Sequence, residues 1–214
     1  MERLLSIMIG YAFGLIQTGY IYGMINKVDI RKHGSGNAGT TNALRTLGWK
    51  AGVITFIGDC LKCVAAVVVI RLIFAQSENV ELLAIYGGLG AVLGHNFPFY
   101  LNFKGGKGIA ATVGLILSIH PIMFLTVAVV FIGIVLVTQY VSLGSLVIMV
   151  LFVIEVILYG QSGGFDLTTP ELYEFYGIAV ILAVLACWRH RANIGRLLNG
   201  TENKTDIRKI GKKK

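Results

Sequence analysis

Long apolar runs alternate along this chain with short polar segments rich in glycine and charge. Five runs stand out: Leu4 to Met24, Ala51 to Phe74, Leu82 to Leu101, Leu143 to Tyr159 and Phe175 to Trp188. A helix needs about 20 apolar residues to cross the hydrocarbon core of a bilayer. The pattern therefore predicts an all-α, polytopic integral membrane protein.

A further apolar run extends from Ile109 to Val137 and is either one long helix or two helices joined by a turn. His120 and Pro121 lie near its middle. Proline has no amide hydrogen, and it disfavours helix at the residue before it. The sequence of the run alone leaves both alternatives open.

The charge distribution favours two helices. Basic residues gather in segments 26–50, 102–108 and 189–214, and acidic residues lie in two other connections. Cytoplasmic loops are rich in Lys and Arg, and only an odd number of helices places all three basic segments inside. We therefore predict seven transmembrane helices, with the N-terminus outside and the C-terminus cytoplasmic. The fourth is short, about Gly108 to Ile119, so it barely spans and its start is expected to be buried in protein.

Composition supports the membrane class and limits the partners. The chain has 214 residues, of which 55% are hydrophobic and 14% are charged, whereas a soluble domain has about 25% charged residues. We expect a single membrane domain over residues 1–214. The net charge of +8 is typical of proteins that bind nucleic acid, anionic lipid or an anionic substrate. The apolar runs make nucleic acid the least favoured of these, and we expect no nucleic-acid partner.

Two features inside the apolar runs carry potential chemistry. Cys60 and Cys63 have CxxC spacing, but no second Cys or His pair completes a zinc set, so we predict buried thiols and no metal or other cofactor. Asp59 and Lys62 lie three residues apart and can pair on a helix. Charged residues in a span are functional candidates, and an ion pair that orients the helix is the equal alternative.

The first basic segment contains a stretch suited to an anion. Its glycines permit close backbone approach, its Ser, Thr and Asn side chains donate hydrogen bonds, and an arginine fork suits phosphate. The candidate residues are Ser35, Asn37, Gly39, Thr41, Asn42 and Arg45. An ordinary turn that caps a following helix is the alternative, and composition does not separate the two.

The second basic segment leads directly into the short fourth helix. Its candidates are Lys104, Gly105, Gly106, Lys107 and Gly108. A helix N-terminus preceded by glycines and lysines favours an anion. It is not a Walker A loop, because a glycine stands where that motif needs Ser or Thr after the lysine. Lysines that only anchor the inside face would leave the glycines unexplained. Nearby, His95 is either a base or a hydrogen-bonding structural residue.

The third basic segment combines a histidine, an amide and a guanidinium. On one helix His190 and Asn193 share a face, as do Asn193 and Arg196. The alternative is a juxtamembrane helix that binds anionic lipid. We assign that simpler role to the final cluster, Arg208 to Lys214.

In order and spacing, these pieces resemble the bacterial membrane acyl-phosphate:glycerol-3-phosphate acyltransferases of the PlsY family. The resemblance covers nearly the whole chain. The matching pieces are Ser35-Gly36-Asn37 through Arg45, Gly58-Asp59 with Lys62, Gly94-His95-Asn96-Phe97-Pro98, Lys104 to Gly108, and Arg189-His190-Arg191 with Asn193, Arg196, Gly200 and Glu202.

The resemblance implies transfer of a fatty acyl group from acyl phosphate to the 1-hydroxyl of sn-glycerol 3-phosphate. The products would be lysophosphatidic acid and phosphate, in the first acylation step of phospholipid biosynthesis. It also implies a multi-pass protein of the bacterial cytoplasmic (inner) membrane, with its active site on the cytoplasmic face. We expect a monomer in contact with membrane lipid, and transient contact with the soluble enzyme that forms the acyl phosphate.

With the resemblance, the candidates fall into two groups. We expect Ser35, Arg45, His190 and Asn193 to be catalytic. We expect Asn37, Gly39, Thr41, Asn42, Lys104, Gly105, Gly106, Lys107, Gly108, Arg196 and Glu202 to bind substrate. The His-x4-Asp signature of other glycerolipid acyltransferases is absent, which suggests that the donor's own phosphate accepts the proton.

Two other functions compete with an acyltransferase. A small anion transporter would also use basic glycine loops, but the polar segments all face one side and the chain has no internal repeat of the kind many transporters show. A lipid-binding scaffold would use the basic tail, but it leaves residues 34–45 unexplained. Turnover separates both from an enzyme.

Overall fold

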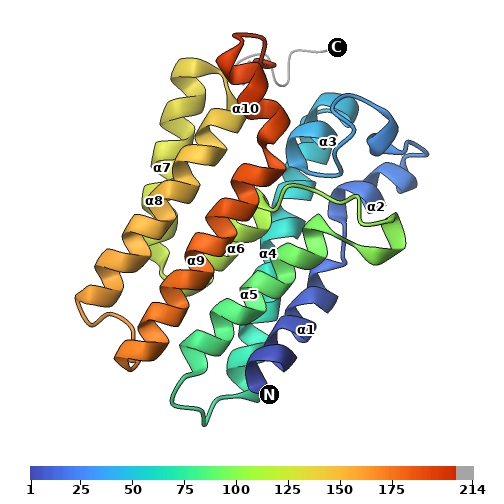
Figure 1. Cartoon of the computed structure of the whole chain (residues 1–214). Helices are drawn as coiled ribbons and strands as arrows, with labels where there is room; N and C mark the ends of the chain where they lie inside the picture. The colour runs from blue at the N-terminus through green and yellow to red at the C-terminus, as the bar shows by residue number, and fades with distance from the viewer. Residues whose placement is uncertain (206–214) are drawn as a thin grey trace. The chain divides into compact units, whose positions relative to one another are not determined.

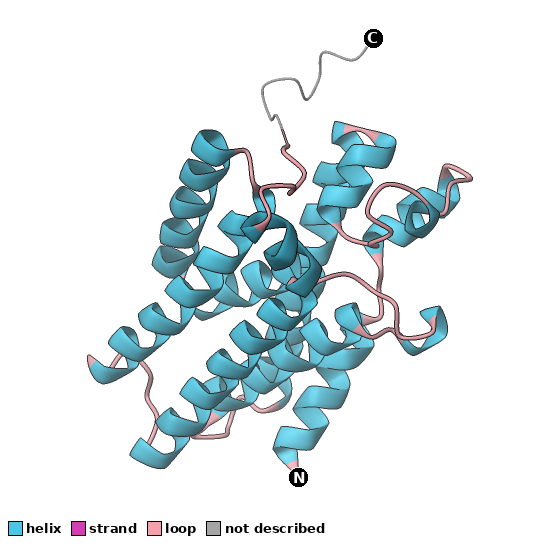
Figure 2. Cartoon of the chain, turned by 45° about the horizontal axis from the view of Figure 1, so that its top comes forward, coloured by secondary structure: helices cyan, strands magenta, loops and turns pink. Residues whose placement is uncertain are grey.

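The structure is a computed structural model that describes residues 1–205 (Figures 1 and 2), and this part of the chain is helical without strands. It divides into two compact units, Met1–Ile119 and His120–Lys214. The predicted lipid-binding cluster Arg208 to Lys214 lies outside the described residues. The expectation of one membrane domain over the whole chain stays a prediction.

The first unit is built around α1, α4 and α5. Its elements are α1 (Glu2–Gly14), α2 (Thr18–Ile25), η1 (Ile30–Lys32), α3 (Thr40–Leu47), α4 (Trp49–Ile73), α5 (Val80–Asn96), η2 (Phe99–Leu101) and α6 (Ile109–Ile119). Helix α4 packs against α1, α5 and α6, and α1 lies along α5. A Cβ atom on Gly10 of α1 would lie 1.9 Å from the carbonyl oxygen of Gly87 on α5. Glycine is therefore required for this close helix contact.

The second unit contains three long helices and a short one. They are α7 (Pro121–Thr138), α8 (Val141–Gln161), α9 (Thr169–Arg189) and α10 (Arg191–Leu198). Helix α8 packs against both α7 and α9. A capping box between Thr168 and Glu171 starts α9, because the two side chains satisfy backbone amides that have no partner inside the helix.

The predicted set of spans is confirmed. The described residues contain 6 helical segments long and apolar enough to cross a membrane, together with the shorter apolar helix Ile109–Ile119. The run from Ile109 to Val137 is split where the sequence predicted, because α6 ends at Ile119 and α7 begins at Pro121. His120 caps α7, and its Nδ1 accepts a hydrogen bond from the amide of Ile122 at 3.2 Å. The orientation across the membrane stays a prediction.

Two predicted helices differ from the structure in detail. The first span is broken between α1 and α2, and the buried Gln17 side chain hydrogen-bonds to backbone carbonyls at the break. Its Nε2 donates to the carbonyls of Gly14 at 3.1 Å and His95 at 3.1 Å. The run predicted to extend to Leu101 leaves the helix at Asn96 instead. Proline at the second position beyond that residue cannot donate the amide that a continuing helix needs.

Candidate functional site

A single asparagine organises the first polar loop. Asn42, which is 1% exposed, lies in the first turn of α3. Its Nδ2 donates to the carbonyls of Ile30 at 2.7 Å, His33 at 3.1 Å and Asn37 at 2.8 Å. Its Oδ1 accepts from the amide of Ser35 at 2.8 Å. The loop is therefore held in shape before any ligand binds. The side-chain amide of Asn42 uses its hydrogen bonds to hold it.

Glycines let the same loop turn tightly over this asparagine. Gly34 and Gly36 have φ values of 59° and 70°, which residues with a Cβ rarely adopt. A Cβ on Gly34 would lie 2.3 Å from Oδ1 of Asn42. Gly39 precedes α3 and donates its amide to Oδ1 of Asn37 at 3.0 Å. The sequence argument that these glycines serve a special backbone shape is thus supported by the geometry.

The loop presents polar side chains around the start of α3. Ser35 is exposed, and Asn37 and Thr41 are half-buried. Arg45 is exposed in the last turn of α3. An anion placed at the start of α3 would meet hydroxyl and amide donors together with the N-terminal end of that helix.

The turn that leads into this loop is fixed by an ion pair. The Asp29 carboxylate accepts from Nε of Arg31 at 3.0 Å and from Nη2 at 2.9 Å. This hydrogen bonding keeps the pKa of Asp29 below its usual value, although partial burial opposes the effect. Arg31 also stacks over the ring of Tyr20, with its Cζ 4.5 Å from the centroid. Both contacts place Arg31 in a structural role.

The second polar loop is docked against the end of α5 through its backbone. The amide of Gly105 donates to the carbonyl of Asn96 at 3.2 Å, and the amide of Gly106 donates to the carbonyl of His95 at 3.1 Å. A Cβ on Gly105 would lie 2.0 Å from that His95 carbonyl oxygen, and one on Gly106 would lie 1.9 Å from Nε2 of His95. A residue with a Cβ at either position would force the loop or the structure that it packs against to move.

The loop ends at the N-terminus of α6. Gly108 has a φ of 89° and lies immediately before Ile109, the first residue of that helix. Lys104 is exposed and Lys107 is half-buried. The first amides of a helix attract an anion, and the anion site expected at these residues stays a prediction.

A buried charge network lies directly beneath this loop. Nζ of Lys62 donates to Oδ1 of Asp59 at 2.8 Å, to the carbonyl of Ile16 at 2.6 Å and to Nδ1 of His95 at 2.8 Å. The predicted pairing of Asp59 with Lys62 is confirmed, and both side chains are nearly inaccessible. Because an ammonium group can only donate, Nδ1 of His95 is the acceptor and the ring proton lies on Nε2. Nδ1 of His95 is therefore occupied by this network and does not act as a base.

The third predicted group begins at the junction between two helices. Helix α9 ends at Arg189, and His190 precedes the first residue of α10. Nδ1 of His190 is 2.8 Å from the carbonyl oxygen of Ala186, so Nδ1 carries a proton and donates it to that carbonyl. His190 and Asn193 are buried, at 3% and 7% exposure.

Glu202 joins the other two members of this group. Its Oε1 accepts from Nδ2 of Asn193 at 2.8 Å, and its Oε2 accepts from Nε of Arg196 at 2.8 Å. The carboxylate is thus committed to orienting an amide and a guanidinium, and its negative charge disfavours direct contact with a phosphate. The segment that carries it is fixed by a hydrogen bond of 2.8 Å from the amide of Thr205 to the carbonyl of Gln139.

Sequence reasoning found these polar segments but not the contacts that hold them. Gln17 and His95 act through contacts with partners 78 and 33 residues away, respectively, and local spacing contains no sign of such contacts. Asn42 was expected to bind substrate, whereas its hydrogen bonds place it inside the loop. In the described part of the chain no group of at least three His, Cys, Asp or Glu side chains is arranged to hold a metal ion.

The sequence matches one protein family and many individual relatives. The profile of the family described as glycerol-3-phosphate acyltransferase matches residues 4–200. A glycerol-3-phosphate acyltransferase of Halalkalibacterium halodurans is 42% identical over 205 residues, which cover 95% of this chain and 93% of that protein. One of Clostridioides difficile is 43% identical over 211 residues, covering 96% and 94%.

Solved structures of similar fold also exist. Crystal structures of PlsY, an integral membrane glycerol 3-phosphate acyltransferase, match in two forms. The glycerol 3-phosphate form is 32% identical with a TM-score of 0.82 and covers 98% of each chain. The lysophosphatidic acid form is 31% identical with a TM-score of 0.81 and covers 100% of each chain.

Proposed function

Because the chain belongs to the glycerol-3-phosphate acyltransferase family, we propose that it transfers a fatty acyl group from acyl phosphate to the 1-hydroxyl of sn-glycerol 3-phosphate. Lysophosphatidic acid and inorganic phosphate are the products. The observation that carries this proposal is the presence of two preformed, glycine-built loops with basic residues in one compact unit, around Asn42 and against His95. Donor and acceptor each bring a phosphate, so the reaction needs two anion sites.

The side chains divide by the groups they offer. Lys104, Lys107, Arg45 and Arg196 hold phosphate oxygens by charge, and the N-terminus of α6 adds its backbone dipole. The hydroxyl and amide groups of Ser35, Asn37 and Thr41 donate hydrogen bonds to the same substrates. Gly39, Gly105, Gly106 and Gly108 let the loop backbone approach the substrates closely. Asn42 and Glu202 act indirectly, because their polar atoms already orient the loop and the Asn193–Arg196 pair.

The chemical step needs little from the protein beyond positioning. The acceptor hydroxyl attacks the acyl carbonyl, the bond from the carbonyl carbon to the phosphate oxygen breaks, and the leaving phosphate takes the hydroxyl proton. His95 does not compete for that proton, since its Nδ1 accepts from Lys62. His190, with Nδ1 committed to a carbonyl, orients glycerol 3-phosphate together with Asn193 and leaves the proton of the 1-hydroxyl to the phosphate. The rate enhancement then comes from orientation and charge stabilisation.

The membrane setting completes the proposal. The three basic segments lie on the cytoplasmic side of a bacterial inner membrane. Their excess of Lys and Arg supports this orientation. The donor's acyl chain lies in the lipid, and glycerol 3-phosphate enters from the cytoplasm. A soluble enzyme that makes acyl phosphate supplies the donor through transient contact, and the chain works as a monomer without a cofactor.

The test is acyl transfer by the purified protein in detergent or lipidic mesophase. Palmitoyl phosphate and glycerol 3-phosphate are the substrates, phosphate release is the readout, and palmitoyl-CoA runs in parallel. We expect phosphate release that requires glycerol 3-phosphate and is lost in Arg45→Ala and Lys104→Ala. Lys50→Ala is the matched control, since Lys50 is an exposed lysine at the start of α4. A folded protein that uses palmitoyl-CoA but releases no phosphate from palmitoyl phosphate would refute the proposed donor.

A further inference from the structure

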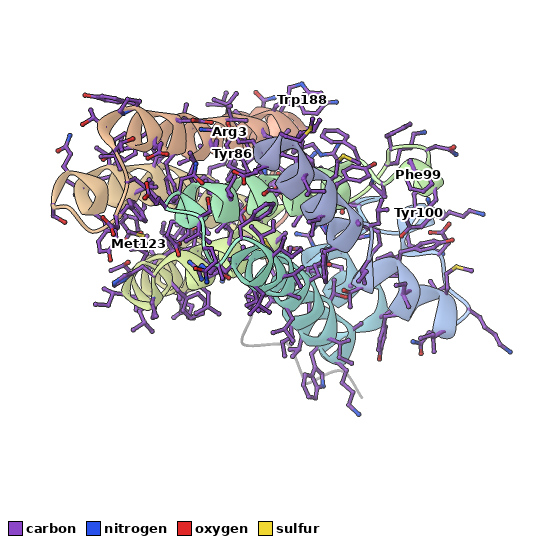
Figure 3. All side chains as sticks on the ribbon, turned by 90° about the horizontal axis from the view of Figure 1, so that it is seen from below. Arg3, Tyr86, Phe99, Tyr100, Met123 and Trp188 are labelled. Carbon is purple, nitrogen blue, oxygen red and sulfur yellow. The ribbon has the colours of Figure 1, made fainter. Side chains whose placement is uncertain are left out.

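Three aromatic residues stand exposed on the turn that joins α5 to the glycine loop. Phe99, Tyr100 and Phe103 are 57%, 44% and 59% exposed, and we call residues 98–103 the aromatic turn. Figure 3 shows Phe99 and Tyr100 on this turn, which in Figure 1 projects sideways from the helices of the first unit. Apolar rings of this size are seldom grouped on a water-exposed loop without a partner.

Helix lengths place the aromatic turn inside the depth of the bilayer. Helix α4 has 25 residues and α5 has 17, and the short connection 74–79 joins their adjacent ends. At ~1.5 Å per residue, α5 ends about 12 Å before the level at which α4 begins. The contact between Lys62 and His95 agrees, because Lys62 is well inside α4 whereas His95 is near the end of α5. Helix α4 outlasts the ~30 Å hydrocarbon core, so the turn lies near the core's edge.

The backbone of the turn is suited to a medium with little water. The amides of Leu101 and Phe103 donate to the carbonyl of Pro98, each at 3.0 Å. The amides of Asn102 and Lys104 donate to the carbonyls of Phe99 and Leu101 at 3.1 and 3.2 Å. Pro98 has no amide hydrogen to satisfy. Non-helical backbone is tolerated near hydrocarbon only where its polar groups find partners, and these four amides find theirs on residues of the turn.

The conformation of Phe103 is unusual for an aromatic residue. Asn102 and Phe103 have φ values of 54° and 58°, and a bulky aromatic residue in this region is strained. Burial inside the protein does not repay the strain, because the ring is mostly exposed. The turn is nevertheless anchored, since the hydroxyl of Tyr100 donates to the carbonyl of Leu15 at 2.6 Å.

We propose that the aromatic turn inserts Phe99 and Phe103 among the lipid chains at the edge of the hydrocarbon core, on the side of the membrane that holds the polar loops. Asn102 is exposed between these rings, and its amide hydrogen-bonds at the level of the headgroups. Lipid insertion thereby fixes the depth of the glycine loop that follows. This inference does not depend on which reaction the protein catalyses.

Tryptophan fluorescence in liposomes tests the proposal. Trp49→Phe and Trp188→Phe give a background without tryptophan, into which Phe99→Trp and Phe103→Trp are introduced one at a time. Phosphatidylcholine brominated on its acyl chains quenches from the lipid, and acrylamide quenches from water. We expect bromolipid to reduce the emission at both positions strongly and acrylamide to reduce it weakly.

Two reference proteins calibrate the result. Val129→Trp in the same background reports a lipid-facing site, because Val129 is 70% exposed within the span formed by α7. A protein that keeps only Trp49 reports the start of α4, beyond the level of the turn, where we expect stronger acrylamide quenching. Unchanged melting temperatures show that each variant is folded. Emission at either inserted position that acrylamide quenches and bromolipid does not would overturn the proposal, and so would protection from both quenchers, which indicates cover by protein.

Discussion

Replacing Gly106 by alanine should disable the second polar loop without unfolding the protein. The added Cβ would lie 1.9 Å from Nε2 of His95, whereas ordinary contact begins at 3.4 Å. Either the ring or the loop must therefore move by about 1.5 Å. The ring is 2% exposed and bonded to Lys62, so we expect the loop to move.

A displacement of about 1 Å near reacting groups costs on the order of 10²-fold in rate. We therefore expect kcat/KM for glycerol 3-phosphate to fall by about 100-fold in Gly106→Ala. The assay is phosphate release from palmitoyl phosphate, with the melting temperature measured alongside. Gly133→Ala is the matched control, because nothing lies within 4 Å of a Cβ at that helical glycine. If the two variants were equally active, the proposed docking of the loop on His95 would be wrong.

Three other substitutions test the contacts that hold the polar segments. Lys62→Met should destabilise the fold by about 3–5 kcal/mol, because it leaves the Asp59 carboxylate buried and unpaired. In thermal unfolding, the double variant with Asp59→Asn should recover much of this lost stability. An equal loss of stability in the single and double variants would argue against a coupled pair. Asn42→Ala should lower the melting temperature and the activity, since each buried polar group left unsatisfied costs about 1–3 kcal/mol, and unchanged activity would contradict its role in the loop. Glu202→Gln should raise KM for glycerol 3-phosphate and leave the melting temperature nearly unchanged, because Arg196 loses its charged partner at a half-exposed position. A lower KM would indicate that the Glu202 carboxylate repels the substrate.

The helices were predictable because membrane insertion depends on length and apolarity, and both are local properties. Pro121 and the distribution of basic residues were enough to divide the long apolar run correctly. The break in the first span was not predictable. Gln17 looks like a tolerated polar residue in the sequence, and its partners on α5 become visible only in three dimensions.

The candidate site divides in the same way. Glycines and basic residues mark the two loops, because backbone freedom and charge are properties of the residue types themselves. The residues that hold the loops are ordinary by type. Asn42 resembled a ligand-binding amide, and Glu202 resembled a substrate contact, yet each one orients neighbouring protein groups. Whether a polar side chain faces a ligand or its own chain is decided by packing, which spacing does not encode.

The glycine contact between α1 and α5 has a consequence for how this protein behaves outside its membrane. The carbonyl oxygens of Gly87, Ala91 and Tyr11 lie 1.9–2.3 Å from where Cβ atoms on Gly10, Gly14 and Gly94 would stand. Backbone therefore meets backbone, through dispersion and weak Cα–H···O contacts. Such forces do not depend on the exclusion of water or on the thickness of a particular bilayer. The helix pair that carries His95 should thus survive transfer into micelles of differing chain length, with its spacing unaltered.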